Sequence, residues 1–392
     1  MLTNLRVRKI VFLVLVGILV FVLVGIIFLT ALARLVIHGL SMPVTTQPGI
    51  SAVSVCASTD RGKTPLGASY SSMVYDPASG QLVVFGGMST RNRILNGTWI
   101  LDGDHWHCFY SPAGPSARYQ ASMAYDATTR SVVLFGGEGR YGKPLNGTWI
   151  WNGHTWLHTN PPSSPSARYG ATMAYDPATS QLVLSGGQNA SGTIFNDTWI
   201  WDGRTWKRMH QPGSSPTTVF SSIAYDTTTR QLILIGGIRS YSLRRNPFNL
   251  SVWYWNGLHW QNGSLPYSSQ ACNTTIYPGC KYWSPPQPLI PPVRYAGSIA
   301  YMPNGTVLLW GGMGKSLINP LSDTWVLVDN HWNRMSTVVH PPGLYAAEAA
   351  YDPAYHGVIL FGGVQGINYD SSINSEFWLW NGSKWQILHF PA

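Results

Sequence analysis

Charged residues are scarce in this chain of 392 residues: Asp, Glu, Lys and Arg together make up 10% of it, while 45% is hydrophobic. Amphipathic helices need a charged face, so this balance argues against a helical protein. Glycine (40), tryptophan (18) and tyrosine (20) are abundant instead. Such a composition suits many short strands joined by tight turns, and it predicts an all-β protein with a large core.

Clusters of lysine and arginine are also missing, although the formal net charge is +9. Residues 1–40 hold no acid and four bases (Arg6, Arg8, Lys9 and Arg34), so the remainder has 21 bases against 16 acids, or +5. Nucleic-acid-binding proteins combine clustered bases with a recognisable reading module, and neither is present. We therefore expect no nucleic-acid partner.

An uncharged run of 23 residues covers 10–32, which is long enough to cross a bilayer as one helix. The bases in front of it place residues 1–9 in the cytoplasm as a basic stub and the rest of the chain outside. The alternative is a signal peptide cleaved near Ala33, because Ala31-Leu32-Ala33 has the small residues of a cleavage site. The apolar run exceeds the usual signal length and favours an uncleaved signal-anchor. In both cases the protein is exported.

Four cysteines in an exported chain indicate disulfides rather than metal ligands. Cys272 and Cys280 would close a short loop. Cys56 and Cys108 are then left for each other, which would join the lead-in segment to the first repeat. The histidines are spread among the repeats, so we expect neither a metal site nor a cofactor.

A motif recurs six times along the chain. Diglycines are spaced by 50, 50, 50, 75 and 51 residues, at Gly86-Gly87, Gly136-Gly137, Gly186-Gly187, Gly236-Gly237, Gly311-Gly312 and Gly362-Gly363. Each is followed by two tryptophans seven positions apart: Trp99 and Trp106, Trp149 and Trp156, Trp199 and Trp206, Trp253 and Trp260, Trp325 and Trp332, Trp378 and Trp385. A fixed period of this length predicts one repeat architecture rather than several domains.

Each repeat contains four short strands, which we call A to D. In the third repeat, Asp176-Pro177-Ala178-Thr179 separates A from B, and Asp202-Gly203 separates C from D. Both are turn-forming sequences, so the unit is predicted to be an antiparallel meander. The glycines let a neighbouring sheet or an indole approach the backbone, and the tryptophans are expected to fill the wedge between repeats.

A diglycine followed by two spaced aromatics is the signature of the kelch family, which the chain resembles over about residues 66–389. The resemblance implies a six-bladed kelch-type β-propeller with strand A innermost, and it implies no single activity. Galactose oxidase, a copper enzyme with kelch-like repeats, uses converging Tyr and His ligands and a Cys bonded to one Tyr, and no such set can be matched here.

The predicted organisation is a cytoplasmic stub (1–9), a transmembrane helix (10–32), a linker and lead-in (33–65) and a propeller (66–392). The six blades lie near 66–110, 115–160, 165–210, 216–264, 291–336 and 342–389, with an insertion at 265–290. Both terminal blades look complete, so the sequence leaves open how the ring closes. Residues 52–58 are a candidate extra edge strand.

The two faces of such a propeller differ in loop length. The A–B and C–D turns share one face, which we call the turn face, and are short. The B–C and D-to-A connections share the other, which we call the loop face, and are longer. Long loops on a rigid scaffold are the usual place of binding, so we predict the ligand site on the loop face. Kelch propellers that bind peptides generally use this face, which is what the resemblance implies.

The loop face is rich in cations and would suit an anionic or sugar-like partner. The B–C loops contain Arg91, Arg93, Arg140, Lys143, Arg239, Arg244, Arg245 and Lys315, with Tyr141, Tyr241 and Tyr369 available for stacking. Arg118, Arg168 and Arg294 begin strands A and could reach a ligand at the channel mouth, although a repeated Arg-Tyr also suits packing between blades. The Arg-rich loop of the fourth blade could instead be solvated or rest on anionic lipid.

Glu348 is the one acidic residue predicted to face the channel. Strand A of other blades has Ser or Thr at its place (Ser122, Thr172, Ser222 and Ser298). A carboxyl group there could have a shifted pKa and act as an acid or base, or simply form an ion pair with an arginine. The aspartates that follow a tyrosine at the A–B turns are read as turn caps.

Three functional readings follow, and the first is preferred. It is a non-enzymatic, membrane-tethered module outside the cell membrane that binds a protein, peptide or glycan on its loop face. The second is a carbohydrate-active enzyme of the sialic acid epimerase or glycosidase type, using Glu348 with Arg118, Arg168 and Arg294. The third is a purely structural surface protein.

Overall fold

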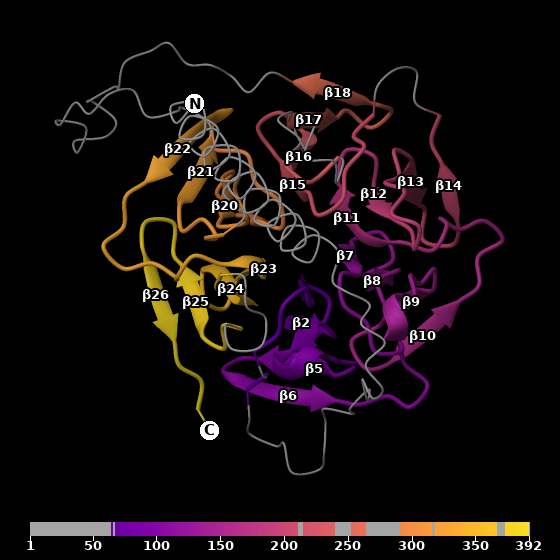
Figure 1. Ribbon diagram of the computed structural model, residues 1–392, viewed down its shortest axis with the longest axis horizontal. Coiled ribbons are helices and arrows are strands. Elements are labelled where there is room, and N and C mark those ends of the chain that lie inside the picture. Colours follow the sequence, from indigo (N-terminus) through magenta and orange to yellow (C-terminus); the bar gives the residue numbers. More distant parts are fainter. Residues whose placement is uncertain are drawn as a thin grey trace, which may run out of the picture. The chain divides into compact units, whose positions relative to one another are not determined.

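The structure is a computed structural model that describes residues 64–65, 67–210, 215–239, 252–263, 291–315, 318–366 and 373–391. Six four-stranded antiparallel sheets follow one another along the chain. In Figure 1 they succeed one another around a common centre, from indigo to yellow. The prediction of an all-β, six-bladed propeller is confirmed.

The first three blades contain these elements, given in chain order. Blade one has β1 (Ser72–Asp76), β2 (Gln81–Phe85), β5 (Thr98–Asp102) and β6 (His105–Phe109), with β3 (Met88–Ser89), η1 (Thr90–Asn92) and β4 (Arg93–Ile94) in its B–C loop. Blade two has β7 (Ser122–Asp126), β8 (Ser131–Phe135), β9 (Thr148–Trp151) and β10 (Trp156–Thr159), with η2 (Arg140–Gly142) in that loop. Blade three has β11 (Tyr169–Asp176), β12 (Gln181–Gln188), β13 (Thr198–Trp201) and β14 (Trp206–Arg208).

The last three blades repeat the same order of strands. Blade four has β15 (Ser222–Asp226), β16 (Gln231–Ile235), β17 (Val252–Trp255) and β18 (Trp260–Gly263). Blade five has β19 (Ser298–Tyr301), β20 (Val307–Trp310), β21 (Thr324–Val328) and β22 (His331–Met335). Blade six has β23 (Tyr345–Asp352), β24 (Gly357–Val364), β25 (Phe377–Trp380) and β26 (Trp385–Leu388).

The A–B turns are closed by buried aspartates. Asp176 accepts hydrogen bonds from the Ala178 backbone N–H (3.0 Å) and from the Thr179 hydroxyl (2.9 Å). Asp76, Asp126 and Asp226 accept the same pair, and Asp352 accepts the backbone bond. An aspartate that satisfies the donors of its own turn holds the hairpin in register. The interpretation of these acids as turn caps is confirmed.

The diglycines form the seams between blades. Gly186 and Gly187 have left-handed backbone angles (φ +71° and +86°), and a Cβ at Gly186 would lie 2.2 Å from the Thr218 carbonyl oxygen of the next blade. The Gly187 N–H donates to that same oxygen at 2.8 Å. In all six diglycines the second N–H donates to a carbonyl oxygen of the neighbouring blade. These oxygens belong to Arg118, Arg168, Thr218, Arg294, Leu344 and Ala68. Each seam therefore needs a backbone without side chains.

Indoles fill the wedge next to each seam. Trp206 of blade three is buried, and its Nε1–H donates to the Thr148 hydroxyl of blade two at 2.9 Å. The same bond joins Trp156 to Thr98, Trp260 to Thr198 and Trp385 to Thr324. At the seam between blades six and one, Phe377 stands in place of the threonine, and the Trp106 ring packs against it at a tilt of 33° with centroids 5.2 Å apart. The predicted wedge of tryptophans is confirmed.

The ring closes without strand exchange, because blades one and six each form a complete sheet from consecutive strands. Six backbone hydrogen bonds of 2.8–3.0 Å form a closed circle between residues at the start of the innermost strands: Tyr70, Gln120, Gly170, Phe220, Ala296 and Ala346. In each, the N–H donates to the carbonyl of the preceding blade. The Tyr70 N–H completes the circle by donating to Ala346 of blade six.

Several predictions from the sequence concern residues outside those described. They include the transmembrane helix at 10–32, the candidate strand at 52–58, the insertion at 265–290 and the cysteines Cys56, Cys272 and Cys280. Among the described residues, none forms a helix long and apolar enough to cross a membrane. Cys108 lies on β6 and is not a free thiol, but both predicted pairings stay predictions.

A pair of glycine variants would measure how much the close contact at a seam contributes to the free energy of unfolding. Gly186→Ala places a methyl group against the Thr218 carbonyl, whereas Gly192→Ala meets nothing within 4 Å although Gly192 has a similar φ of +78°. We expect Gly192→Ala to cost roughly 1–2 kcal/mol, the price of a left-handed L-residue. Gly186→Ala should cost about 3 kcal/mol or more in urea unfolding, because the seam must open. Equal losses would contradict the role of the seam.

Candidate functional site

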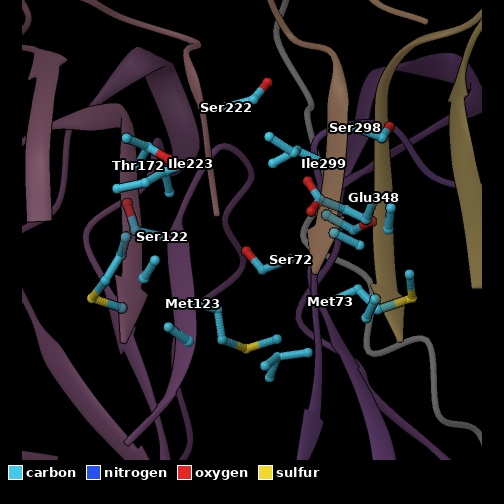
Figure 2. A pocket seen from close by; sticks show the side chains of 18 of the residues that line it. Ser72, Met73, Ser122, Met123, Thr172, Ser222, Ile223, Ser298, Ile299 and Glu348 are labelled. Carbon is cyan, nitrogen blue, oxygen red and sulfur yellow. The ribbon is translucent and has the colours of Figure 1, made fainter. Parts of the chain in front are cut away.

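The innermost strands of all six blades enclose a central cavity of about 460 Å³. The strands are β1, β7, β11, β15, β19 and β23, and their equivalent residues form layers along the channel. Figure 2 looks into this space and shows a layer of hydroxyl groups together with the single carboxyl group of Glu348. The channel is a concave feature lined by all six blades, which makes it the first place to look for a site.

The hydroxyl layer is largely committed to holding blades together. Ser122 donates to the Ala171 carbonyl of the next blade at 2.8 Å, and Ser222 donates to Gly297 at 2.7 Å. Ser72 and Ser298 make the same bond to Ala121 (3.0 Å) and Ala347 (2.8 Å). Hydroxyls bonded in this way have little left to offer a ligand as donors. Glu348 takes the equivalent place in blade six and breaks the pattern.

Glu348 is an isolated carboxyl group in the interior of the ring. It forms no ion pair with any described residue, so the sequence-based alternative of a simple ion pair is not seen in this part of the chain. Burial raises its pKa to about 8. Glu348 is therefore mainly protonated and neutral at pH 7, although part of its side chain still borders the cavity. A neutral carboxyl group in an apolar channel can donate one hydrogen bond.

The loop-face end of the channel is covered by aromatic rings. Tyr70 of blade one and Phe220 of blade four come from opposite sides of the ring, and their ring centroids lie 5.8 Å apart. Both have left-handed backbone angles (φ 53° and 59°), which aim their side chains over the axis. Four tyrosines surround the pair: Tyr119, Tyr169, Tyr295 and Tyr345. We call these six residues the aromatic plug.

The aromatic plug leaves the turn face as the side from which the cavity is reached. Six half-buried tyrosines, one per blade, line that end: Tyr75, Tyr125, Tyr175, Tyr225, Tyr301 and Tyr351. Burial raises the pKa of Tyr75 and Tyr225, and the nearby turn aspartates add to the effect. The sequence predicts a channel mouth on the loop face, beside the arginines. That placement was wrong, because the sequence does not reveal the left-handed turns that form the plug.

Arg118, Arg168 and Arg294 do not line the cavity. Each is buried, with 3%, 1% and 1% of its surface exposed. Each guanidinium group turns back into its own blade, where Nη1 donates to the diglycine carbonyl of Gly136, Gly186 or Gly311 at 2.7–2.9 Å. Grouping these arginines with Glu348 in one channel was wrong, since their side chains run away from the axis to pack between blades.

Two of these arginines form buried ion pairs. Arg168 donates to both carboxylate oxygens of Asp197, and Arg294 does the same to Asp323 at 2.8 and 2.9 Å. Burial alone would raise the pKa of both aspartates. The hydrogen bonds and charge of the arginines outweigh burial and lower the pKa of each carboxyl group. Nothing in the sequence spacing indicates that these two aspartates are the partners of the arginines.

The B–C loops present the other predicted cations to solvent. Arg93, Arg140, Lys143, Arg239 and Lys315 are exposed. Arg244, Arg245, Tyr241 and Tyr369 lie outside the described residues, so their predicted roles stay predictions. Glu138, in the same loop as Arg140, is buried, and burial raises its pKa to about 7 although a hydrogen bond from Tyr119 opposes the shift. Among the residues described, no three His, Cys, Asp or Glu side chains lie together as metal ligands would.

Comparison with known proteins supports the repeat assignment. A family model, the KLHDC2/KLHL20/DRC7 Kelch-repeats domain, matches residues 110–276. The chain is a six-bladed β-propeller with kelch repeats over these residues. No curated protein matches the chain. A solved structure titled "Structure of YjhT" resembles this kelch propeller with a TM-score of 0.58 and 14% identity, over 83% of this chain and 99% of that one. At that identity the likeness shows the fold alone.

The raised pKa of Glu348 predicts a pH-dependent cost to stability. The folded propeller keeps the proton up to about pH 8, while an unfolded glutamate loses it near the ordinary pKa of 4.5. Stability therefore falls as the pH rises between these values, by up to about 1.4 kcal/mol per pH unit. Glu348→Gln removes this slope, so its Tm should match wild type at pH 5 and exceed it at pH 8.

The matched control for this measurement is Glu376→Gln, because Glu376 is exposed. Its Tm difference from wild type should stay constant over the same range. A Glu348→Gln difference that does not change with pH would show that the carboxyl group is hydrated in the folded protein.

Proposed function

We propose that this kelch propeller is a non-enzymatic recognition module, displayed outside the membrane, that binds an anionic protein, peptide or glycan on its loop face. The supporting observation is that the cations on that face are more exposed to solvent than most of its carboxylates. Its cations are exposed, whereas Asp197 and Asp323 are paired and Glu138 is buried. This leaves Glu376 as the exposed carboxylate among the described residues of this face. A surface of this kind attracts anions and raises their association rate.

Three of the four described acids on the loop face contribute little to its potential, and the exposed Glu376 is the fourth. Asp197 and Asp323 are neutralised by Arg168 and Arg294. Glu138 is buried with a pKa of about 7 and carries only part of a charge at neutral pH. Arg140 and Lys143 stand exposed around it in the B–C loop of blade two. The balance on the described part of this face is therefore positive, although the whole chain outside the first 40 residues is only mildly basic.

The same loop supplies an aromatic surface. Tyr141 is 73% exposed and lies between Arg140 and Lys143 in sequence. It has a left-handed backbone angle (φ 60°) inside η2, a conformation uncommon for a tyrosine. Exposed tyrosine beside arginine is a common composition for binding surfaces. This supports a ligand held between loops above the aromatic plug, rather than one inside the channel.

Charge reversal tests the proposed function. The full chain in detergent micelles would be applied to arrays of glycans and acidic peptides, and the best binder used for titration. We expect Arg140→Glu with Lys143→Glu to weaken binding at least about tenfold and to reduce its salt dependence. The control is Arg204→Glu with Lys384→Glu, two exposed cations in C–D turns of the turn face. Retention of no ligand, or equal loss in the control, would leave the structural-protein reading.

We also propose that residues 10–32 anchor the propeller, with the disulfides Cys272–Cys280 and Cys56–Cys108 formed in an oxidising compartment. The full-length chain should then stay in the membrane pellet after alkaline carbonate extraction. Cleavage near Ala33 would instead release a shorter chain. Replacing Ala31 and Ala33 by leucine separates the two cases, because it changes the fraction that is released only if cleavage occurs.

A further inference from the structure

Blades two, three and five place the same backbone position at the start of strand C on the loop face. The Gly186 N–H of blade three donates to the Asp197 carbonyl at 3.4 Å, and the Gly311 N–H of blade five donates to Asp323 at 3.3 Å. In blade two the Gly136 N–H donates to Gly147 at 3.3 Å. Gly147 is therefore the counterpart of the two aspartates, without their carboxylate.

The aspartates of blades three and five each accept hydrogen bonds from an arginine and from a tryptophan. Besides the paired arginine, the Asp197 carboxylate accepts the Trp199 Nε1–H at 2.8 Å, and the Asp323 carboxylate accepts the Trp325 Nε1–H at 2.7 Å. A guanidinium fork and an indole N–H thus converge on one carboxylate. Charge-assisted bonds of this kind are strong, and the donors are fixed by the blade.

Blade two keeps both donors but has no carboxylate. Arg118 holds the position of Arg168: its Nε donates to the Ser116 carbonyl at 2.9 Å and its Nη1 to Gly136 at 2.9 Å. Its Nη2 donates to the Ser116 hydroxyl at 3.1 Å instead of to an acid. Two of its five N–H groups are left over. No described residue accepts a hydrogen bond from Trp149, the counterpart of Trp199, whose ring only packs on His158 at 4.6 Å.

The lack of a carboxylate in blade two destabilises the charged form of Arg118. The side chain is as buried as the paired arginines, with 3% exposed. Burial lowers its pKa to about 10, and no carboxylate compensates. A buried cation without a counter-charge is unfavourable, and anions that reach it are stabilised in proportion.

The position of the missing carboxylate is close to the surface. Gly147 and Trp149 are half-buried, and His158 is exposed. A Cβ on Gly147 would lie 2.9 Å from Trp149 Nε1, so the indole leans into part of the room that a carboxylate would use. The His158 Nε2 atom would lie 3.5 Å from the same Cβ, so entry of a ligand requires the Trp149 indole to shift.

We propose that blade two carries a carboxylate-binding slot, formed by Arg118 and the Trp149 indole N–H in the space left by Gly147, which is filled from outside the chain. This inference rests on the proposed function, since the slot opens on the loop face beside Arg140 and Lys143. The ligand group is a carboxylate because the slot reproduces the surroundings of Asp197 and Asp323. Its source is an acidic side chain, a chain terminus or a sugar acid.

Gly147→Asp tests the slot by filling it from within, and acetate is the probe. In the full-length protein at constant ionic strength, acetate should raise the Tm of wild type in a saturable way and shift the Trp149 indole N–H resonance. Gly147→Asp should raise the Tm without acetate and abolish both responses. Gly147→Asn, the neutral isostere, should not gain that stability. An absent acetate response in wild type, or one that persists in Gly147→Asp, overturns the slot.

A second binding experiment identifies the source of the carboxylate and tests the slot separately from the proposed function. Binding of a neutral peptide with a free terminus, an amidated peptide with an internal glutamate and a uronic acid would be compared between wild type and Gly147→Asp. The probe that carries the correct kind of carboxylate should bind Gly147→Asp at least about tenfold more weakly than wild type. Loop-face ligands that bind both proteins equally would remove the slot but keep the proposed function. Acetate binding with no array ligand would keep the slot and remove that function.

Discussion

The contact between a bare diglycine and the carbonyl that leads into the next blade controls this structure. At each of the six seams the carbonyl oxygen lies 2.0–2.6 Å from where a Cβ of the first glycine would stand. Neighbouring sheets therefore approach through backbone alone, and indoles fill the space that widens outward. The last seam, between Gly362 and Ala68, has the same geometry as the others, so a ring of six closes with no strand shared between the chain ends.

The same contact decides what the arginines do. Arg118, Arg168 and Arg294 each give their backbone carbonyl to the preceding blade and their guanidinium group to the diglycine carbonyl of their own blade. A residue that spans a seam in both directions is buried by geometry, whatever its charge. Blades three and five supply an aspartate to balance that charge, and blade two does not. The difference in charge pairing between the blades thus arises at a position whose side chain packs between them.

The sequence predicts the fold well because each blade repeats a strong local signal. Spacing of the diglycines gives the number of blades, and the aspartates that follow a tyrosine give the A–B turns. Glu348 is found because it interrupts a column of Ser and Thr. Side-chain direction at the start of strand A cannot be read in this way: Tyr70 and Phe220 adopt left-handed angles that their residue types rarely use. The aromatic plug, and with it the open side of the channel, therefore escapes a sequence-based argument.

Because aromatic rings cover one end of the channel, the propeller is a cup rather than a tube. Whatever enters between the six tyrosines of the turn face must leave by the same route, because the aromatic plug separates it from the loops on the opposite side. The two faces can thus evolve independently, with a neutral carboxyl group at the bottom of one and a set of cations on the other.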